Sequence, residues 1–549
     1  MAAVAFGQAA ATQETYRVPA GVQVSPVAPS VHSAPEPIVC LQAPHARAPM
    51  ARSAYALAAG GAALHLLFSG RYGFFRDELY YLACGQRLAW GYVDHAPLVA
   101  FLARLQQVVL GNSIYAARVL PTLAHAALIL LTAWIARELG GGRFAQGLAA
   151  LLALIAPIYL TFGSFLSMNA FEPLFWMGCT AIFLRIRNGG SGRMWLLFGL
   201  VAGLGILNKH SMLMFGSGIA AGLLLTSARR EFAKPWTWAG AGLAFAIFAP
   251  NLVWEFRHGF PTIALLRAAV EFKYTSIPAW QFVAQQALLA HPLTVPVWIA
   301  GLWFLFRARK GRYAALGWSY VIVLAEMIAL HGKIYYQAPA YPMLFAAGAV
   351  LLESQRIFQN GVWAKAAVTA PLVIGGAIAA PLAMPILPVE TAALYCRFWD
   401  VQSVRVENVP QGELPQLFGD MFGWPEQVEA LARVYGSLRP SQRGKAAILA
   451  YNYGEAAAVD VLGGKYALPK AVSGHNQYAL WGPGEFTGET VVAIGFTEEK
   501  LRALFEEVTP AGQVFAAHAI PEETGVRIFV CRRARKPLRE LWPQLSWLG

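Results

Sequence analysis

Residues 119–136 read VLPTLAHAALILLTAWIA, and residues 147–171 read GLAALLALIAPIYLTFGSFLSMNAF. Neither stretch contains Asp, Glu, Lys or Arg, and the first has a single titratable side chain, His125. A run of about 18 or more apolar residues is long enough to cross the hydrocarbon core of a bilayer as a helix. These two stretches therefore predict an integral membrane protein with more than one membrane-spanning helix.

The composition of the whole chain agrees with this prediction. Of its 549 residues, 57% are hydrophobic and 13% are charged, whereas soluble domains average roughly 25% charged residues. The net charge is +13, but the apolar content argues against a nucleic-acid partner. An anionic membrane surface or an anionic substrate is the expected partner of the basic residues.

The apolar segments predict about eleven membrane helices, each near the roughly 20 residues that span a bilayer. We expect them at residues 52–70, 115–137, 144–162, 168–186, 193–207, 210–226, 236–255, 281–306, 313–330, 336–353 and 363–386. The fold class is thus a polytopic α-helical membrane protein with an added C-terminal domain. We predict a disordered tail over residues 1–48, a membrane domain over 49–386 and an α/β domain over 387–549.

Two regions outside the membrane helices show regular structure of their own. Helical apolar spacing at 74–90 and 97–110 predicts two short helices that lie at the membrane interface. In the C-terminal domain, short apolar strands are predicted to alternate with helices. The expected elements are strands at 446–450, 491–494 and 526–530 and a helix at 425–435.

Lys and Arg in the short connections predict the orientation, because cytoplasmic connections carry an excess of these residues. With the N-terminus in the cytoplasm, the cytoplasmic connections hold Arg137 and Arg143; Arg185, Arg187 and Arg193; Arg229, Arg230 and Lys234; Arg307, Arg309, Lys310 and Arg312; and Arg356 and Lys365. An odd number of helices then places residues 387–549 outside the cytoplasm. In a bacterium this domain is periplasmic.

Cysteines give no framework for a redox or metal site. The chain has five of them, and no CxxC spacing occurs. In an oxidising compartment, pairing of Cys396 with Cys531 is one alternative, which spacing alone does not decide.

Asp77 and Glu78 follow the first membrane helix, in the segment FRDELYY (75–81). A carboxylate here can accept a proton from an attacking hydroxyl or amine. Burial of one carboxyl group beside another raises the pKa of one of the two, which suits that group to accept a proton near neutral pH. The alternative is a solvated loop in which Asp77 interacts with Arg76.

Asp94 and His95 lie in the same outer loop, and they add an acid and a group that titrates near neutral pH. One loop therefore concentrates four residues that transfer protons or bind cations. A divalent metal ion is an alternative ligand, but nothing in the spacing fixes a ligand geometry. The sequence therefore assigns no metal-binding residue.

Three further segments fall at the same predicted side of the membrane. Asn169 and Glu172 share a helix face, and an ionisable residue that enters a membrane helix is a functional candidate. Two lysines lie at this predicted outer side, against the positive-inside trend: Lys209, beside His210, and Lys333, near Tyr335 and Tyr336. Phosphate binding explains why lysines occur there. For the two tyrosines, an aromatic belt at the interface is the alternative. Together the segments predict a site with acids for proton transfer and cations for a phosphate leaving group.

At this point the sequence resembles the family 39 glycosyltransferases, the membrane enzymes related to protein O-mannosyltransferases and to the lipid A aminoarabinose transferase. The resemblance covers roughly residues 52–350, with a further likeness of the C-terminal domain to the extracytoplasmic domain of bacterial members. The segments that carry it are Asp77-Glu78, Asp94-His95-Ala96-Pro97, Glu172-Pro173, Lys333 to Tyr336, Pro339 to Pro342, Tyr451 to Glu455, Ser473 to Asn476 and Leu480 to Pro483. Two departures occur: family members often have Lys-Pro after the second-loop acid, where this chain has His95, and many have Asp near Glu172.

The resemblance implies a GT-C fold and an inverting transfer of a sugar from a polyprenyl-phosphate donor to a lipid A, glycolipid or protein acceptor. It implies that Asp77 is the catalytic base, with Glu78 beside it. Donor phosphate would be held by residues of the outer loops, namely Lys333, Lys209, His210, Tyr335, Tyr336 and Arg71. Substrate would contact Asp94, His95, Asn169 and Glu172.

From these expectations we predict a monomeric glycosyltransferase of the bacterial inner membrane. A sugar that is already bound to a lipid phosphate needs no nucleotide, in agreement with the lack of a glycine-rich phosphate loop in the sequence. A transporter or flippase for a lipid-linked sugar is the competing class, although no two matching halves with broken helices are evident. A non-catalytic scaffold would leave the charge on one side unexplained.

Overall fold

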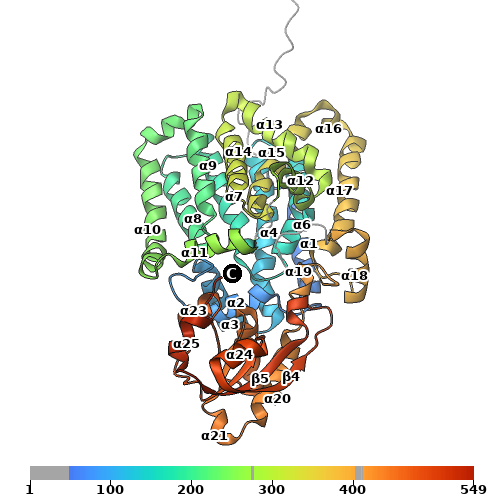
Figure 1. The fold of residues 1–549 in the computed structure, drawn as a ribbon. Coiled ribbons are helices and arrows are strands. Elements are labelled where there is room, and N and C mark those ends of the chain that lie inside the picture. The colour runs from blue at the N-terminus through green and yellow to red at the C-terminus, as the bar shows by residue number, and fades with distance from the viewer. Residues whose placement is uncertain (1–47, 274–276, 402–409, 411) are drawn as a thin grey trace, which may run out of the picture. The chain divides into compact units, whose positions relative to one another are not determined.

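The computed structural model describes residues 48–273, 277–401, 410 and 412–549. Helices make up most of the part before residue 384, and a region with a five-stranded sheet follows (Figure 1). The predicted disordered tail, apart from Ala48, lies outside the described residues.

Each predicted membrane segment contains helix. These helices are α1 (Arg52–Phe68), α4 (Ile114–Glu138), α5 (Arg143–Ile155), α6 (Pro157–Phe162), α7 (Met168–Arg187), α8 (Met194–Asn208), α9 (Met212–Leu224), α10 (Pro235–Arg257), α12 (Ala279–Ala290), α13 (Val295–Arg307), α14 (Ala314–Ala329), α15 (Tyr341–Ser354) and α17 (Val362–Ala383). Shorter helices connect them: α2 (Arg76–Gly85), α3 (Leu98–Leu110), η1 (Ser227–Ala233), α11 (Pro261–Ala268), η2 (Ala269–Lys273), η3 (Pro292–Thr294), η4 (Ala308–Gly311), η5 (Ile334–Ala340) and α16 (Arg356–Asn360). The two helices predicted in the first outer loop are confirmed as α2 and α3.

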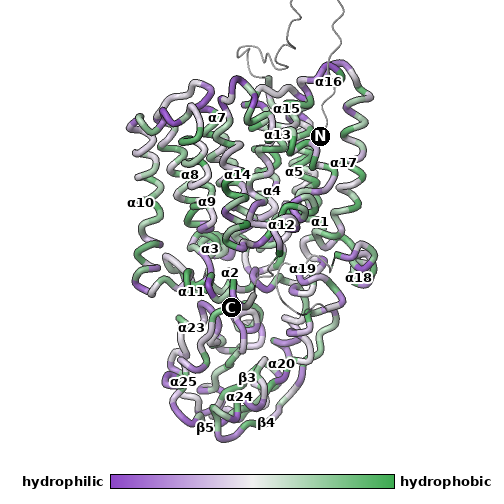
Figure 2. The backbone as a smooth tube through the Cα atoms, turned by 45° about the horizontal axis from the view of Figure 1, so that its top comes forward, coloured by the Kyte–Doolittle hydropathy of each residue, from purple (hydrophilic) through white to green (hydrophobic). Residues whose placement is uncertain are grey.

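Hydrophobic residues dominate these helices, and hydrophilic residues gather at their connections (Figure 2). By length and hydropathy, α4, α10 and α17 are each able to cross a membrane. Two bent pairs, α9 with η1 and α12 with the helices after His291, raise this number from three to as many as five within the described residues. The predicted count of eleven crossings therefore stays a prediction.

Two segments predicted as continuous helices are broken, and proline explains both breaks. Segment 144–162 divides at Ala156 into α5 and α6, with Pro157 as the first residue of α6. Segment 281–306 bends by 97° between α12 and the helices that begin at Pro292. Proline lacks the backbone N–H of a helix interior, and it pushes the residue before it out of the helical conformation.

Glycines let neighbouring helices approach closely, as is common where helices pack in a membrane. A Cβ atom on Gly301 of α13 would overlap the carbonyl oxygen of Leu344 on α15. A Cβ on Gly348 of α15 would overlap the carbonyl oxygen of Val297 on α13. This reciprocal contact fixes the distance between the two helices.

The C-terminal region contains one mixed sheet with the strand order β2-β1-β3-β5-β4. β1 (Ala447–Ala450) is parallel to β2 (Ala471–Ser473) and β3 (Thr490–Ile494), and β5 (Val526–Ala534) is antiparallel to β3 and β4 (Phe505–Val514). The helices of this region are α18 (Val389–Phe398), α19 (Gln416–Gly419), α20 (Trp424–Ser437), α21 (Pro440–Arg443), α22 (Tyr453–Leu462), η7 (Gly463–Tyr466), α23 (Asn476–Trp481), α24 (Glu498–Leu504), η8 (Pro521–Glu523) and α25 (Leu538–Leu545). The three predicted strands and the helix at 425–435 are confirmed, and β2 and β4 were not predicted.

Side chains of the central strands alternate between two hydrophobic clusters, as the period of two of a strand requires. Ile448, Val492 and Ile528 pack with residues of α20 and α22. Leu449 and Val491 pack with residues of α24 and α25. Both faces of the sheet are therefore covered by helices.

The cluster on the α20 and α22 face continues into the first outer loop. It also contains Leu79 and Tyr80 of α2 and Val99 of α3. The outer loop and the C-terminal domain are thus packed as one core, although they lie on opposite sides of the predicted boundary at residue 387. Cys396 and Cys531 are both buried free thiols in separate clusters, so the structure does not support their pairing.

The glycine contact generates a stability prediction. Gly348→Ala forces α13 and α15 apart, and we expect a loss of about 1–3 kcal/mol of stability, as for other overpacked interiors. The matched control is Gly216→Ala on α9, where a Cβ meets no atom within 4 Å. Thermal unfolding of the purified protein in detergent measures both. A Gly348→Ala protein as stable as the control would contradict this packing.

Candidate functional site

The predicted site segments lie at the end of the helices that faces the C-terminal sheet, where α2 lies between the two regions (Figure 1). Asp77 is the second residue of α2 and is partly exposed. Its Oδ1 accepts a hydrogen bond of 2.8 Å from the hydroxyl of Tyr453, at the start of α22. Asp77 is therefore a carboxylate that is oriented by a donor and still reaches solvent.

Glu78 has a different environment, although it is the adjacent residue. It is fully buried and forms an ion pair of 3.1 Å with Arg118 of α4. Its oxygens also accept from the backbone N–H groups of Phe75 and Leu166. Both carboxylate oxygens of Glu78 are thus used to hold the loop together.

Arg118 completes this arrangement from the side of the membrane helices. Its side chain is 1% exposed, and it donates to the backbone carbonyls of Ser69 and Gly73 as well as to Glu78. The turn between α1 and α2 therefore wraps around one guanidinium group. Sequence reasoning missed Arg118, although a charge near the end of an apolar helix was a usable signal.

Lys209 lies between α8 and α9 and is 7% exposed. Its Nζ donates hydrogen bonds of 2.8 Å to Asn169 Oδ1 and to Glu172 Oε2, both on α7. Glu172 also accepts from the hydroxyl of Ser211. The structure thus brings Lys209 together with Asn169 and Glu172, which were predicted from a separate segment.

Lys333, Tyr335 and Tyr336 lie beside this group. Lys333 Nζ is 5.8 Å and Lys209 Nζ is 5.6 Å from the centroid of the Tyr335 ring. Lys209 also lies 4.2 Å from the centroid of the Tyr336 ring. Two lysines therefore share one aromatic ring, an arrangement that concentrates positive charge.

Buried polar side chains support the backbone of this segment. Gln286 donates to the carbonyl of Ile334 at 3.0 Å, and Tyr159 donates to the carbonyl of Ala338 at 2.6 Å. The hydroxyl of Tyr341 in turn donates to Gln286. Because these groups are held by packed helices, η5 and the preceding Lys333 present the lysine and the two tyrosines from a rigid support.

Asp94 accepts a hydrogen bond of 2.8 Å from Tyr80 and one of 3.3 Å from Asn476 of α23. Burial raises the pKa of Asp94 to about 7, and the negative charge of Asp77 adds to the increase. Asp94 therefore titrates near neutral pH.

His95 is buried and stacks on Tyr92 with ring centroids 4.4 Å apart. Burial lowers the pKa of His95 to about 4, so the ring is neutral at pH 7. Its Nδ1 is hydrogen-bonded to the carbonyl of Ala96, whereas its Nε2 has no partner among the described residues. His95 is suited to a neutral hydrogen bond rather than to a cationic contact.

Tyr81 lies between the acids of the outer loop and Tyr335 in its electrostatic contacts. Burial raises the pKa of Tyr81, and nearby Asp77, Asp94 and Tyr335 contribute to the increase. Tyr81 is therefore within electrostatic range of the two acids and of Tyr335.

The other two predicted residues have different contacts. His210 Nε2 is 2.9 Å from Asn251 Oδ1 on α10, and Asn251 donates to the carbonyl of Trp90 in the outer loop. Arg71 is exposed, and its guanidinium lies 5.5 Å from the centroid of the Phe68 ring. His210 thus borders the outer loop, whereas the contact of Arg71 is with the end of α1.

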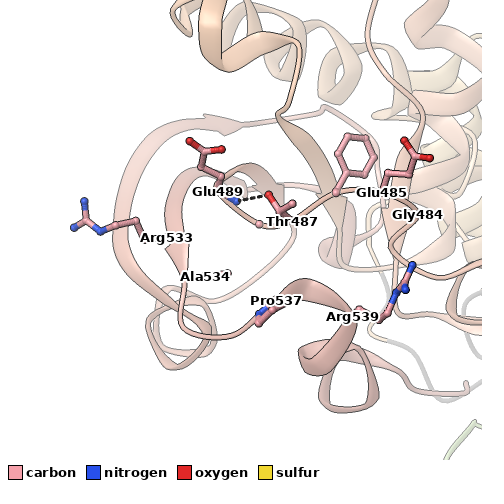
Figure 3. Close-up of a pocket in the computed structure, with 10 residues that line it drawn as sticks. Gly484, Glu485, Thr487, Glu489, Arg533, Ala534, Pro537 and Arg539 are labelled. Atoms are coloured by element: carbon pink, nitrogen blue, oxygen red, sulfur yellow. Dashed lines mark hydrogen bonds between the residues drawn. The ribbon is translucent and has the colours of Figure 1, made fainter.

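Neither a metal cluster nor the hollow in the C-terminal domain coincides with this site. Within the described ranges, no three His, Cys, Asp or Glu side chains are grouped so that they could hold a metal ion. A hollow of about 620 Å³ lies in the C-terminal domain, lined by residues 484–489 and by Arg533, Ala534, Pro537 and Arg539 (Figure 3). The residues predicted from the sequence do not line this hollow.

The two adjacent acids are expected to respond differently to neutralisation. Glu78→Gln leaves the buried Arg118 without a counter-charge, and breaking such a pair costs about 3–5 kcal/mol. Asp77→Asn has little effect because Asp77 is partly exposed. Glu429→Gln is the matched control, since its ion pair with Arg433 is exposed and contributes less than about 1 kcal/mol. Thermal unfolding measures all three, and equal stability of Glu78→Gln and the control would contradict the assignment.

Asp94 makes stability depend on pH. Its pKa is about 7 in the folded protein and about 3.9 in an unfolded chain. The folded state binds this proton more tightly, so the contribution is fully present below about pH 4 and is lost as the pH rises through 7.

We therefore expect the unfolding temperature of the wild type to fall more steeply between pH 5 and pH 8 than that of Asp94→Asn. His95 is present in both proteins, and its effect cancels in the comparison. Thermal unfolding across this pH range tests the prediction. Parallel curves would show that Asp94 ionises in the folded protein as it does in the unfolded chain.

Comparison with known proteins gives a family match over a part of the chain that includes Asp94, Glu172 and Lys209 but neither Asp77 nor Lys333. Residues 94–254 match the family described as dolichyl-phosphate-mannose-protein mannosyltransferase. The chain is 27% identical over 243 residues to the lipid A galacturonosyltransferase RgtD of Rhizobium johnstonii. The aligned region is 44% of this chain and 50% of that protein, so the match spans about half the length of the curated relative.

Solved structures resemble nearly the whole chain. ArnT from Cupriavidus metallidurans bound to undecaprenyl phosphate matches with a TM-score of 0.57 and 14% identity, over 86% of this chain and 97% of that one. The apo structure of the same protein matches with a TM-score of 0.57 and 13% identity, over 87% and 97%. At this identity the likeness shows the fold alone. The resemblance to the GT-C glycosyltransferases that the sequence motifs indicate is thereby confirmed.

Proposed function

We propose that this chain is a glycosyltransferase that moves a sugar from a polyprenyl-phosphate donor to an acceptor on the periplasmic side of the bacterial inner membrane. The observation that carries the proposal is the convergence of Lys209 and Lys333 on the Tyr335 ring, at the same end of the helices as Asp77. Cations for a phosphate and a carboxylate for a proton are the two requirements of such a transfer.

In this proposal, about eleven membrane crossings place the N-terminus in the cytoplasm and the C-terminal domain in the periplasm. The ends of α4 and α7 with Arg137, Arg185 and Arg187 then lie on the cytoplasmic side. The polyprenyl chain lies among the apolar helices, and its phosphate reaches the lysine pair. The protein acts as a monomer.

Asp77 accepts the proton of the acceptor hydroxyl as the hydroxyl oxygen attacks the anomeric carbon of the sugar. The bond between this carbon and the phosphate oxygen breaks, and polyprenyl phosphate leaves. One displacement inverts the anomeric centre. Lys209 and Lys333 stabilise the charge that develops on the phosphate, and preorganised cations of this kind account for a large part of catalysis in many enzymes.

The remaining predicted residues receive supporting roles. Glu172 and Asn169 hold Lys209 in one orientation. Glu78 positions α2 through Arg118 and does not transfer a proton. Asp94 and the neutral His95 offer hydrogen bonds to the bound substrate, and His210, Tyr335 and Tyr336 border the donor phosphate. No step requires a metal ion.

The named relatives support a choice of acceptor and sugar within this proposal. RgtD is described as a lipid A galacturonosyltransferase, so we favour lipid A or a related glycolipid as acceptor and a uronic acid as the first sugar to try. A protein acceptor is less favoured because it rests on the family description alone.

Transfer by the reconstituted protein tests the function. Radiolabelled polyprenyl-phosphate sugars, a total lipid extract and no ion gradient are supplied to wild type, Asp77→Asn and the exposed control Glu429→Gln. We expect label to move to a new lipid with the wild type and the control. Transfer should fall by about 10²- to 10⁴-fold in Asp77→Asn, the range that a general base contributes.

Two outcomes would contradict the proposal. Full activity of Asp77→Asn would remove Asp77 from catalysis. Movement of intact donor across the vesicle membrane, without a new product, would instead support the transporter.

A further inference from the structure

Residues 452–455, with the sequence NYGE, form a hydrogen-bonded cap at the start of α22. The side chain of Asn452 accepts from the backbone N–H of Glu455 at 2.9 Å. The carboxylate of Glu455 accepts from the backbone N–H groups of Asn452 at 3.1 Å and Tyr451 at 2.8 Å. This capping box satisfies donors at the helix N-terminus and fixes where α22 begins.

Tyr453 is the first residue of that helix, so the capping box also fixes its side chain. Its ring is 4.7 Å from the ring of Tyr80 and 4.9 Å from the ring of His475. Its hydroxyl reaches Asp77 at 2.8 Å, across 376 residues of sequence. Since Tyr453 is only 7% exposed, few alternative positions are open to it.

Gly454 allows α22 to come this close to α2. A Cβ atom at this position would lie 2.8 Å from Arg76 Cγ and 2.9 Å from the ring of Trp424. Arg76 in turn forms an ion pair of 2.8 Å with the buried Asp420. Each residue of the segment therefore has a contact that brings the Tyr453 hydroxyl to the carboxylate.

We propose that residues 452–455 are a positioning motif, by which the C-terminal domain orients the carboxylate of Asp77 for proton transfer. The inference rests on the proposed function, in which Asp77 accepts the acceptor proton. One oxygen of Asp77 is held by the phenol, which leaves the other oxygen directed at the acceptor. Tyr453 is a positioning residue, and the C-terminal domain is a part of the active site.

Tyr453→Phe keeps the ring and removes only the hydroxyl. We expect kcat to fall about ten- to hundredfold, which corresponds to the loss of one hydrogen bond to a charged group, while the KM of the donor stays constant. The matched control is Tyr451→Phe, two residues away, where the described contacts involve the ring and the backbone. This control should keep wild-type activity.

The pH profile separates positioning from folding. The titratable side chains that face Asp77 are those of Arg76, Tyr81, Asp94 and Tyr453. With the phenol removed, the ionised carboxylate has one donor fewer, so the acid limb of the rate profile should move to higher pH. Tyr453→Phe should unfold at the wild-type temperature, because the ring and its packing are kept.

The outcomes are distinguishable when Asp77→Asn is assayed in parallel. If Asp77→Asn is inactive but Tyr453→Phe has the wild-type kcat and pH profile, the positioning role is overturned and the proposed function stands. If Tyr453→Phe lowers the unfolding temperature together with kcat, the residue serves packing alone, and the inference is wrong. If Asp77→Asn is fully active, the proposed function itself fails.

Discussion

The buried ion pair between Glu78 and Arg118 is the interaction on which the site depends. It joins α2 to α4 with both side chains at most 1% exposed. A charge pair in such a place is stable only when additional hydrogen bonds satisfy both groups, because desolvation of two ions is costly. Here backbone groups of residues 69, 73, 75 and 166 provide those bonds. The pair therefore fixes the start of α2, and with it the position of Asp77.

Charge is distributed over the site in a consistent way. The acids lie on the outer loop, and the cations lie at the ends of the helices beneath it. Lys209 is paired with Glu172, and both Lys209 and Lys333 lie near the ring of Tyr335. In the proposed function, this pair of lysines binds the phosphate of the lipid-linked donor.

Much of the fold was predictable because its signals are local. Apolar runs predicted the helices of the membrane domain, and short apolar runs and one helical spacing predicted β1, β3, β5 and α20 of the C-terminal domain. The grouping of Lys209 with Glu172 followed from placing both on one side of the membrane. The breaks before Pro157 and Pro292 were missed because a proline in an apolar run can also lie inside an unbroken helix, as Pro121 does in α4.

The contacts that complete the site were not predictable from one sequence. The bonds from Tyr453 to Asp77 and from Asn476 to Asp94 join residues 376 and 382 positions apart. Nor does the sequence distinguish the partly exposed Asp77 from the buried Glu78, since their difference arises from Arg118 on another helix. Tertiary contacts decide which of two adjacent acids is available for chemistry.

A structure of the protein with a bound polyprenyl-phosphate sugar, determined in lipid nanodiscs, tests the central claim most directly. The account predicts the phosphate within hydrogen-bond distance of Lys209 or Lys333 and the anomeric carbon facing Asp77. A phosphate bound elsewhere, with the sugar out of reach of Asp77, would contradict it.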